Sequence, residues 1–115
     1  MPAEFDRGRR IAVLVQREVT EVLSREMRDQ RLSMLTVTRV DLSRDHKNAD
    51  IGITSMDDTL QRQAMISSLD RASGWIRVQL GRRLHLKVVP NLHFYYDDSV
   101  EKGMALSRLI DDLQR

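Results

Sequence analysis

Apolar residues change their spacing several times along this chain, and each change indicates a different element of secondary structure. Between Arg10 and Arg28 they recur at i, i+3 and i+4, which is typical of an amphipathic helix. The next segment, MLTVTRVDLS, alternates, but the alternation changes phase after Val37, which predicts a strand with a bulge. A polar loop, SRDHKN, separates it from ADIGIT, which alternates in one phase. The two segments predict a hairpin with one buried face.

The segment after the hairpin has helical spacing again, up to residue 84 or 86. Asp57 and Asp58 are good caps for a helix that begins near Thr59. In the middle of this segment, Gly74 costs a helix about 1 kcal/mol relative to Ala, and Ser73 competes for backbone hydrogen bonds. We therefore expect a kink at the Ala-Ser-Gly sequence, with a helical piece on each side of it.

The end of the chain predicts one strand and one helix. Pro90 forbids further helix, and NLHFYY alternates as a third strand does. The sequence DSVE, Asp98 to Glu101, has the pattern of a capping box, so a last helix should begin here with several apolar residues available for packing. Because no repeat or linker interrupts the chain, residues 1–115 predict a single α+β domain. Its order is α-β-β-α-kink-α-β-α, a three-stranded sheet packed by helices.

The composition argues against several classes of function. The chain has no cysteine, so it has no disulfide, no thiolate nucleophile and no cysteine-based zinc site. His46, His85 and His93 lack the spacing of metal ligands on one helix, and the glycines do not form a phosphate-binding loop. Paired acids are explained better as helix caps than as a catalytic dyad. We expect no enzymatic activity, metal, cofactor or small-molecule substrate. With no bilayer-spanning run and no signal-peptide pattern at the start, we also expect a cytoplasmic protein without a membrane partner.

Positive charge is concentrated in one part of the chain. The net charge is only +2, yet residues 71–96 contain five cations and no acid. These cations are Arg71, Arg77, Arg82, Arg83 and Lys87. Such a stretch is typical of a surface that binds a polyanion. The alternative is a solvated helix face whose counter-charges come from the acids of residues 41–70 or 97–115.

The kink and the basic stretch point to the same function. A kink would free backbone N–H groups and open a second helix N-terminus, which together bind anions. The lack of a side chain at Gly74 would let a phosphate backbone approach closely. On a helical wheel Trp75 lies between Arg71 and Arg82, opposite the apolar positions, where it could stack on a base. Alternatively, the kink rotates Trp75 into the core.

Two further groups of cations are candidates for the same surface. Arg10, Arg17 and Arg28 follow the polar side of the first helix, where an acid lies between them. They form either a solvated face or an extension of the binding surface. Arg44 and Lys47 lie in the hairpin loop, where a polar turn explains them as well.

Three segments carry a resemblance to a known family. They are RRIAVLVQREVTEVLSREMRD (9–29), MLTVTRVDLSRD (34–45) and ASGWIRVQLGRRLHLKVVPNLHFYYDDSVEKGM (72–104). With the order of elements, they resemble the ribosome-binding factor A family of small bacterial proteins over nearly the whole chain. In that family an Ala-x-Gly kink replaces the Gly-x-x-Gly loop of ordinary KH domains, and here it falls on Ala72, Ser73 and Gly74. The run from Val89 to Asp97 is the most specific piece.

The resemblance implies a KH-like domain of type II that binds the small ribosomal subunit and its ribosomal RNA during late maturation, particularly in the cold. It implies no enzymatic reaction, and we expect the protein to be monomeric when free. Gln30 stands where many members have proline, and the chain ends at Arg115 without their charged tail, so contacts of such a tail are not carried over. From the residues themselves, the expected RNA contacts are Arg10, Arg17, Arg44, Lys47, Arg71, Ser73, Gly74, Trp75, Arg77, Arg82, Arg83 and Lys87.

Two other functions remain open. Exposed apolar residues such as Trp75 and Val78 could form a homodimer or dock a protein partner without RNA. Salt separates this alternative from the first, because binding through phosphates weakens steeply as salt rises and an apolar interface changes little. A KH-like module for messenger RNA or single-stranded DNA fits less well, since the Ala-x-Gly kink lacks the second glycine of the usual backbone clamp.

Overall fold

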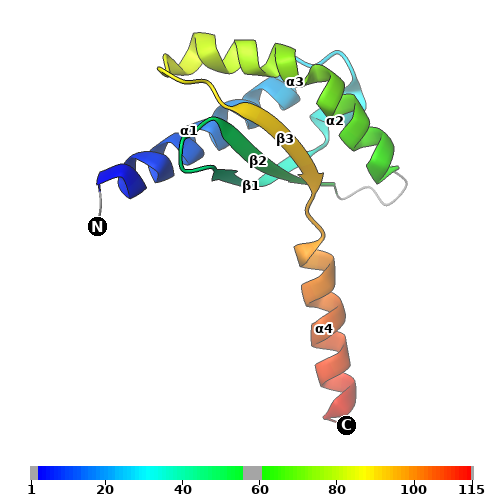
Figure 1. Cartoon of the computed structure of the whole chain (residues 1–115). Coiled ribbons are helices and arrows are strands. Elements are labelled where there is room, and N and C mark those ends of the chain that lie inside the picture. Colours follow the sequence, from blue (N-terminus) through cyan, green and yellow to red (C-terminus); the bar gives the residue numbers. More distant parts are fainter. Residues whose placement is uncertain (1–2, 56–60, 115) are drawn as a thin grey trace.

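The computed structural model describes residues 3–55 and 61–114, which form four helices and three strands (Figure 1). In chain order these are α1 (Ala3–Arg25), α2 (Gln30–Ser33), β1 (Thr36–Leu42), β2 (Asn48–Thr54), α3 (Arg62–Leu84), β3 (Asn91–Tyr96) and α4 (Ser99–Leu113). The predicted α+β class and the predicted order of the long elements are confirmed. None of the described helices is long and apolar enough to cross a membrane.

The sheet has the order β1-β2-β3 and mixes two kinds of pairing. The strands β1 and β2 pair antiparallel as the predicted hairpin, whereas β2 and β3 pair parallel, so α3 is the crossover between them. The predicted bulge is confirmed. Val37 pairs with Ile53 and Arg39 pairs with Gly52, which leaves Thr38 as the extra residue.

Helices α1 and α3 cover one face of the sheet. They contact each other, with α1 packed mainly on β1 and α3 on β3 (Figure 1). The apolar faces predicted from the spacing meet in this layer and form a single core, which contains Val15, Val19, Val22, Leu23, Leu32, Leu35, Val37, Ala49, Ile51, Ile53, Met65, Leu69, Ile76, Leu80, Leu92 and Phe94. No described helix covers the other face of the sheet, where Asp50, His93 and Tyr95 are exposed.

The long helix α3 bends without breaking. It is one continuous helix from Arg62 to Leu84, and Figure 1 shows that its direction changes partway along. The expected kink is therefore a bend, and the second helix N-terminus that a break would create is not formed. The helix ends where the spacing predicted, at His85, whose backbone is left-handed (φ 50°). The predicted caps Asp57 and Asp58 lie outside the described residues.

A short helix that the spacing did not predict, α2, follows α1. The carboxylate of Asp29 accepts a hydrogen bond from the backbone N–H of Arg31 (3.0 Å), which caps the helix, and Leu32 is buried in the core. Four residues are too few to show a helical period, so this element could be recognised only by its cap. It closes one end of the space between α1 and α3.

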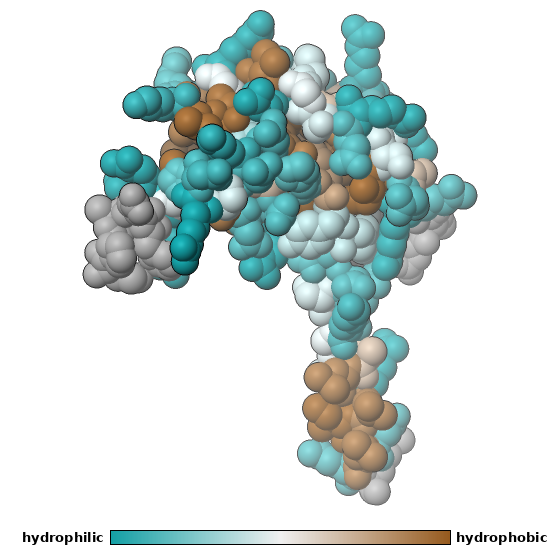
Figure 2. All heavy atoms as spheres, in the orientation of Figure 1, coloured by the Kyte–Doolittle hydropathy of each residue, from teal (hydrophilic) through white to brown (hydrophobic). Residues whose placement is uncertain are grey.

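The last helix, α4, is present as predicted but does not pack on the domain. Figure 1 shows it pointing away from the sheet, and Figure 2 shows apolar side chains gathered on its visible face. Its six large apolar side chains are 45–77% exposed. The expected capping box is wrong, because Asp98 pairs with Lys102 (3.4 Å) and Glu101 pairs with Arg62. The backbone N–H of Ser99 donates instead to the carboxylate of Asp97 (3.0 Å).

Candidate nucleic-acid interface

The outer face of α3 carries the side chains that the helical wheel placed there. Arg71, Val78 and Arg82 are exposed, while Ile76 and Leu80 on the opposite face are buried. Trp75 is 44% exposed, so the bend does not rotate it into the core. A half-exposed indole among cations is the arrangement that stacking on a base requires.

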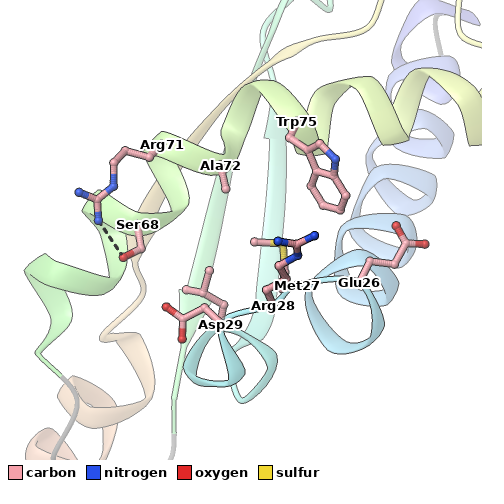
Figure 3. A pocket seen from close by; sticks show the side chains of 9 residues that line it. Glu26, Met27, Arg28, Asp29, Ser68, Arg71, Ala72 and Trp75 are labelled. Carbon is pink, nitrogen blue, oxygen red and sulfur yellow. Dashed lines mark hydrogen bonds between the residues drawn. The ribbon is translucent and has the colours of Figure 1, made fainter.

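A cleft lies beside Trp75, between α3 and the segment that joins α1 to α2. It has a volume of about 600 Å³. Figure 3 shows the indole of Trp75 directed from α3 toward Met27, Arg28 and Glu26 on the other side. Its lining residues are Glu26, Met27, Arg28, Asp29, Leu32, Ser68, Arg71, Ala72 and Trp75.

Ser73 and Gly74 face a different groove, on the other flank of α3. This groove lies against the start of the edge strand β3, and Asp70, Arg77 and residues 91–93 complete it. The hydroxyl of Ser73 donates to the backbone carbonyl of Asp70 (2.7 Å), so it is already engaged within the helix. Gly74 is exposed, and a Cβ built there would meet no described atom within 4 Å outside its own helix turn. The structure therefore separates the Ser73–Gly74 pair from Trp75, which the sequence had placed in one site.

Two of the five cations of the basic stretch have partners outside α3. Arg77 donates from Nε and Nη2 to the backbone carbonyl of Val89 (3.2 and 2.9 Å), which holds the loop after α3. Arg83 pairs with Glu18 (3.4 Å) and with Glu26. The counter-charges for Arg83 thus come from α1 and the residue directly after it, and not from the acidic segments on either side of the basic stretch.

The other three cations are available to a ligand. Arg82 and Lys87 are exposed and have no acidic partner in the described part of the chain. Arg71 is also exposed and donates only to the hydroxyl of Ser68 (3.3 Å). All three cations lie on α3 or in the loop that follows it, and their charge is not neutralised within the described domain.

The hairpin loop between β1 and β2 adds cations close to the loop that follows α3. The backbone N–H of Asn91 donates to the carbonyl of Lys47 (2.8 Å), which brings the hairpin loop and the loop of Lys87 together. Arg44 and Lys47 are exposed. Two connections at this end of the domain thus carry exposed cations, and the hairpin loop also contains Asp45, whose carboxylate accepts a hydrogen bond from the backbone N–H of Lys47 (3.0 Å).

The three cations predicted on the first helix differ in their partners and in their position. Arg10 is exposed, whereas Arg17 pairs with Glu18 (3.6 Å) while its side chain remains 65% exposed. Both belong to the polar side of the helix. Arg28, which the sequence grouped with them, lies beyond the end of α1 and lines the Trp75 cleft.

Among the described titratable groups, Asp97 has a strongly shifted pKa and a structural role. No group of three or more histidines, aspartates or glutamates among the described residues could hold a metal ion. The pKa of Asp97 is lowered from 3.8 to about 2, because its carboxylate accepts hydrogen bonds from the hydroxyl of Thr38 and the backbone N–H of Ser99. This carboxylate joins the bulge of β1 to the start of α4.

Sequence reasoning missed the wall of the cleft that faces Trp75. Arg28 and Met27 were assigned to the first helix, and the short helix with Leu32 was not predicted. The signal available was Asp29, an N-cap residue that ends one helix and starts another within a few positions.

The fold is that of a KH-like α+β domain, in which one long bent helix presents an exposed aromatic ring and free cations. The chain matches the family model for ribosome-binding factor A over residues 7–110. It belongs to the ribosome-binding factor A family. This is a family of ribosome-binding factors and not of enzymes.

Individual relatives agree with this assignment. A ribosome-binding factor A from Thiobacillus denitrificans is 48% identical over 111 residues, which cover 96% of this chain and 90% of the relative. One from an Azoarcus species is 42% identical over 115 residues, which cover 100% of this chain and 91% of the relative. The crystal structure of ribosome-binding factor A from Thermus thermophilus has the same fold, with a TM-score of 0.69 at 24% identity over 77% of this chain and 94% of that one.

Proposed function

We propose that this protein is a ribosome assembly factor that binds the small ribosomal subunit through its ribosomal RNA. Membership of the ribosome-binding factor A family carries the proposal. A homology model of the Thermus thermophilus ribosome-binding factor A, with a TM-score of 0.62 to this chain, was fitted into a cryo-EM map of a complex of that protein with the 30S subunit. The positive surface of α3 and the neighbouring loops is the physical reason why such a chain would bind RNA.

The free cations carry most of the proposed contact. Arg71, Arg82 and Lys87 neutralise phosphates, with Arg44 and Lys47 at one end of the surface and Arg10 and Arg17 as outlying contacts. The groove at Ser73 and Gly74 receives a stretch of RNA backbone, because no side chain at Gly74 keeps it away.

Arg77 and Arg83 contribute to this surface in a different way. Each already has a partner within the domain, so much of its effect is to hold the loop after α3 or to hold α3 on α1. Their substitution would change the shape of the surface as well as its charge.

Late maturation of the subunit is the proposed step. A factor that binds an immature RNA conformation more tightly than the mature one stabilises the first and leaves when the second forms, which requires only a difference in affinity. We expect loss of the protein to slow the appearance of mature subunits, and to do so more at low temperature. Subunit profiles of a deletion strain at two temperatures would test this, and equal profiles at both would contradict the role in the cold.

Co-sedimentation with purified small subunits tests the binding directly. We expect wild-type binding that weakens as salt rises, and a large loss in Arg82→Glu/Lys87→Glu, because both side chains are free of acidic partners in the described domain. Arg83 is left unchanged, since its reversal would place a third acid beside Glu18 and Glu26. The matched control is Lys102→Glu/Arg108→Glu, which reverses two charges on α4 and should bind as wild type does.

The alternative, a protein-interaction or homodimerisation domain, is favoured by the exposed apolar face of α4 (Figure 2). If subunit binding does not respond to salt and survives Arg82→Glu/Lys87→Glu, a protein contact replaces the RNA contact. Sedimentation equilibrium of the free protein tests self-association. We expect the mass of a monomer, and a concentration-dependent rise toward twice that mass would support the homodimer.

A further inference from the structure

We infer that the cleft beside Trp75 holds one unpaired base of the bound RNA, stacked between the Trp75 indole and the Arg28 guanidinium. The inference rests on the proposed function and adds to it a nucleotide site that the positive surface alone does not supply. It concerns a part of the domain distinct from the groove at Ser73 and Gly74.

The walls of the cleft suit a flat aromatic ligand. Trp75 comes from α3 and Arg28 from the segment after α1, and Figure 3 shows their side chains directed toward each other across the opening. Met27, Leu32 and Ala72 supply apolar surface. A base can stack on an indole on one face and on a guanidinium plane on the other, because both are flat and the guanidinium is weakly hydrated. The volume of about 600 Å³ admits a nucleotide.

The charges of the cleft favour a phosphate-bearing ligand over a protein side chain. Its two acids are already paired within the domain, Glu26 with Arg83 and Asp29 with Arg31 (2.9 Å). Arg28 and Arg71 have no acidic partner among the residues that the structure describes. The side chains left for a ligand are thus an aromatic ring and two cations, which is the combination that proteins use to bind single-stranded RNA.

Only an unpaired base fits this geometry. In a duplex each base is stacked on its neighbours, so neither face is open to Trp75 and Arg28. The cleft therefore selects a loop, bulge or strand end. A factor with such a site would distinguish an RNA segment that is still unpaired from the same segment after pairing.

The fluorescence of Trp75 reports on the site, because it is the only tryptophan in the chain. The intact protein is titrated with a short single-stranded RNA and with a fully paired, blunt-ended duplex of the same base composition, and a dye on the RNA measures binding independently. We expect the single strand to quench the tryptophan emission to saturation. The duplex should bind through the cations with little quenching.

Variants then separate stacking from charge. Trp75→Ala should weaken binding of the single-stranded RNA about tenfold, since stacking contributes about 1–3 kcal/mol per base. Binding of the duplex should be unchanged. Trp75→Phe, which keeps a ring, should recover most of the loss. Arg28→Ala should weaken binding of the single-stranded RNA more than binding of the duplex. Val78→Ala is the matched control, because Val78 is exposed on α3 to a similar degree (51% against 44% for Trp75) but does not line the cleft.

Equal quenching by the two RNAs, or unchanged single-strand affinity in Trp75→Ala, would overturn the inference. Both results are compatible with salt-sensitive binding to small subunits, so the cleft can fail while the proposed function stands. If the protein binds neither RNA nor small subunits, the proposed function fails and the inference with it. Circular dichroism of each variant confirms that the helices are intact; Trp75 is 44% exposed, so its truncation leaves the buried core unchanged.

Discussion

Helices α3 and α4 both have an apolar side and a polar side, yet one forms half of the helical layer and the other packs on nothing in the described domain. Four side chains of α3 are buried, whereas α4 has no buried residue along its described length. The difference lies in where each helix leaves the sheet. As the crossover between two parallel strands, α3 must return across the sheet face, whereas α4 follows the last strand and no further strand constrains it.

The start of α4 also holds it away from the domain. The carboxylate of Asp97 binds Thr38 of β1 and the first N–H of α4, and Glu101 pairs with Arg62 at the start of α3. These contacts set the direction of the helix within its first turn. An amphipathic pattern therefore predicts a helix, but the connections of that helix decide whether its apolar side is buried.

The largest effect should come from shortening a buried side chain of α3. Ile76 is fully buried on the core side of α3, and Ile76→Ala should lower the free energy of unfolding by about 3 kcal/mol through lost burial and the cavity that remains. Urea denaturation measures the change. A loss below about 1 kcal/mol would mean that the packing around Ile76 is loose and that α3 is only weakly bound to the sheet.

The same substitution, glycine to alanine, should destabilise the domain when made in the sheet but not when made in α4. A Cβ at Gly52 would lie 2.8 Å from Thr38 Oγ1 and 2.9 Å from the hydroxyl of Tyr95, so Gly52→Ala should destabilise the domain by about 1–2 kcal/mol. A Cβ at Gly103 in α4 would meet no described atom within 4 Å, so Gly103→Ala should raise helix content without changing domain stability. Circular dichroism and urea denaturation of the two variants provide the comparison. A destabilised Gly103→Ala would show that α4 packs on the domain in solution.

The contacts by which Asp97 joins β1 to the start of α4 should depend on pH. Because the folded pKa of Asp97 is about 2 and its ordinary value is 3.8, its contribution to stability is complete above the ordinary value and is lost as pH falls through the folded value. Asp97→Asn should be less stable than wild type near neutral pH, and the difference should shrink over that acidic range. Asp98→Asn is the control, because the carboxylate of Asp98 pairs with the exposed Lys102. A difference between wild type and Asp97→Asn that does not change with pH would assign the effect to something other than this charge.

The elements with a long, regular period could be predicted from the sequence. The spacing identified α1, the hairpin with its bulge and the apolar side of α3, because burial on one face imposes a period on the residues. The sequence left open whether Trp75 is exposed or rotated into the core, and the structure shows it exposed. A helical wheel assumes a straight helix, so it cannot predict how a bend turns the second half of the helix.

The partners of the basic side chains could not be predicted in this way. Arg83 and Glu18 are 65 positions apart, and their pairing depends on how α1 and α3 are packed. The same holds for Arg77, whose acceptor is a backbone carbonyl that every residue carries. Counting charges along the chain therefore identified the positive segment but not which of its cations are free, and α2 was too short to give any period.

A smaller effect, a gain, should appear at the end of α3. His85 has a left-handed backbone that costs a residue with a Cβ about 1 kcal/mol and costs glycine almost nothing. His85→Gly should raise the free energy of unfolding by somewhat less than that, because glycine also gains freedom in the unfolded chain. The urea midpoint should shift upward with an unchanged slope. A downward shift would show that the His85 side chain makes a contribution larger than the backbone strain.

The smallest effect should come from shortening an apolar side chain on α4. Leu109 is 56% exposed, so Leu109→Ala removes little buried surface and should change the free energy of unfolding by less than about 0.5 kcal/mol. Measured beside Ile76→Ala, it compares two aliphatic truncations on two amphipathic helices. The difference between the two values is then the stabilisation that comes from burial against the sheet and not from the sequence pattern. If Leu109→Ala destabilised the protein by several kcal/mol, the apolar side of α4 would be packed in solution against its own domain or against a second chain. A loss that depends on protein concentration would indicate the second chain.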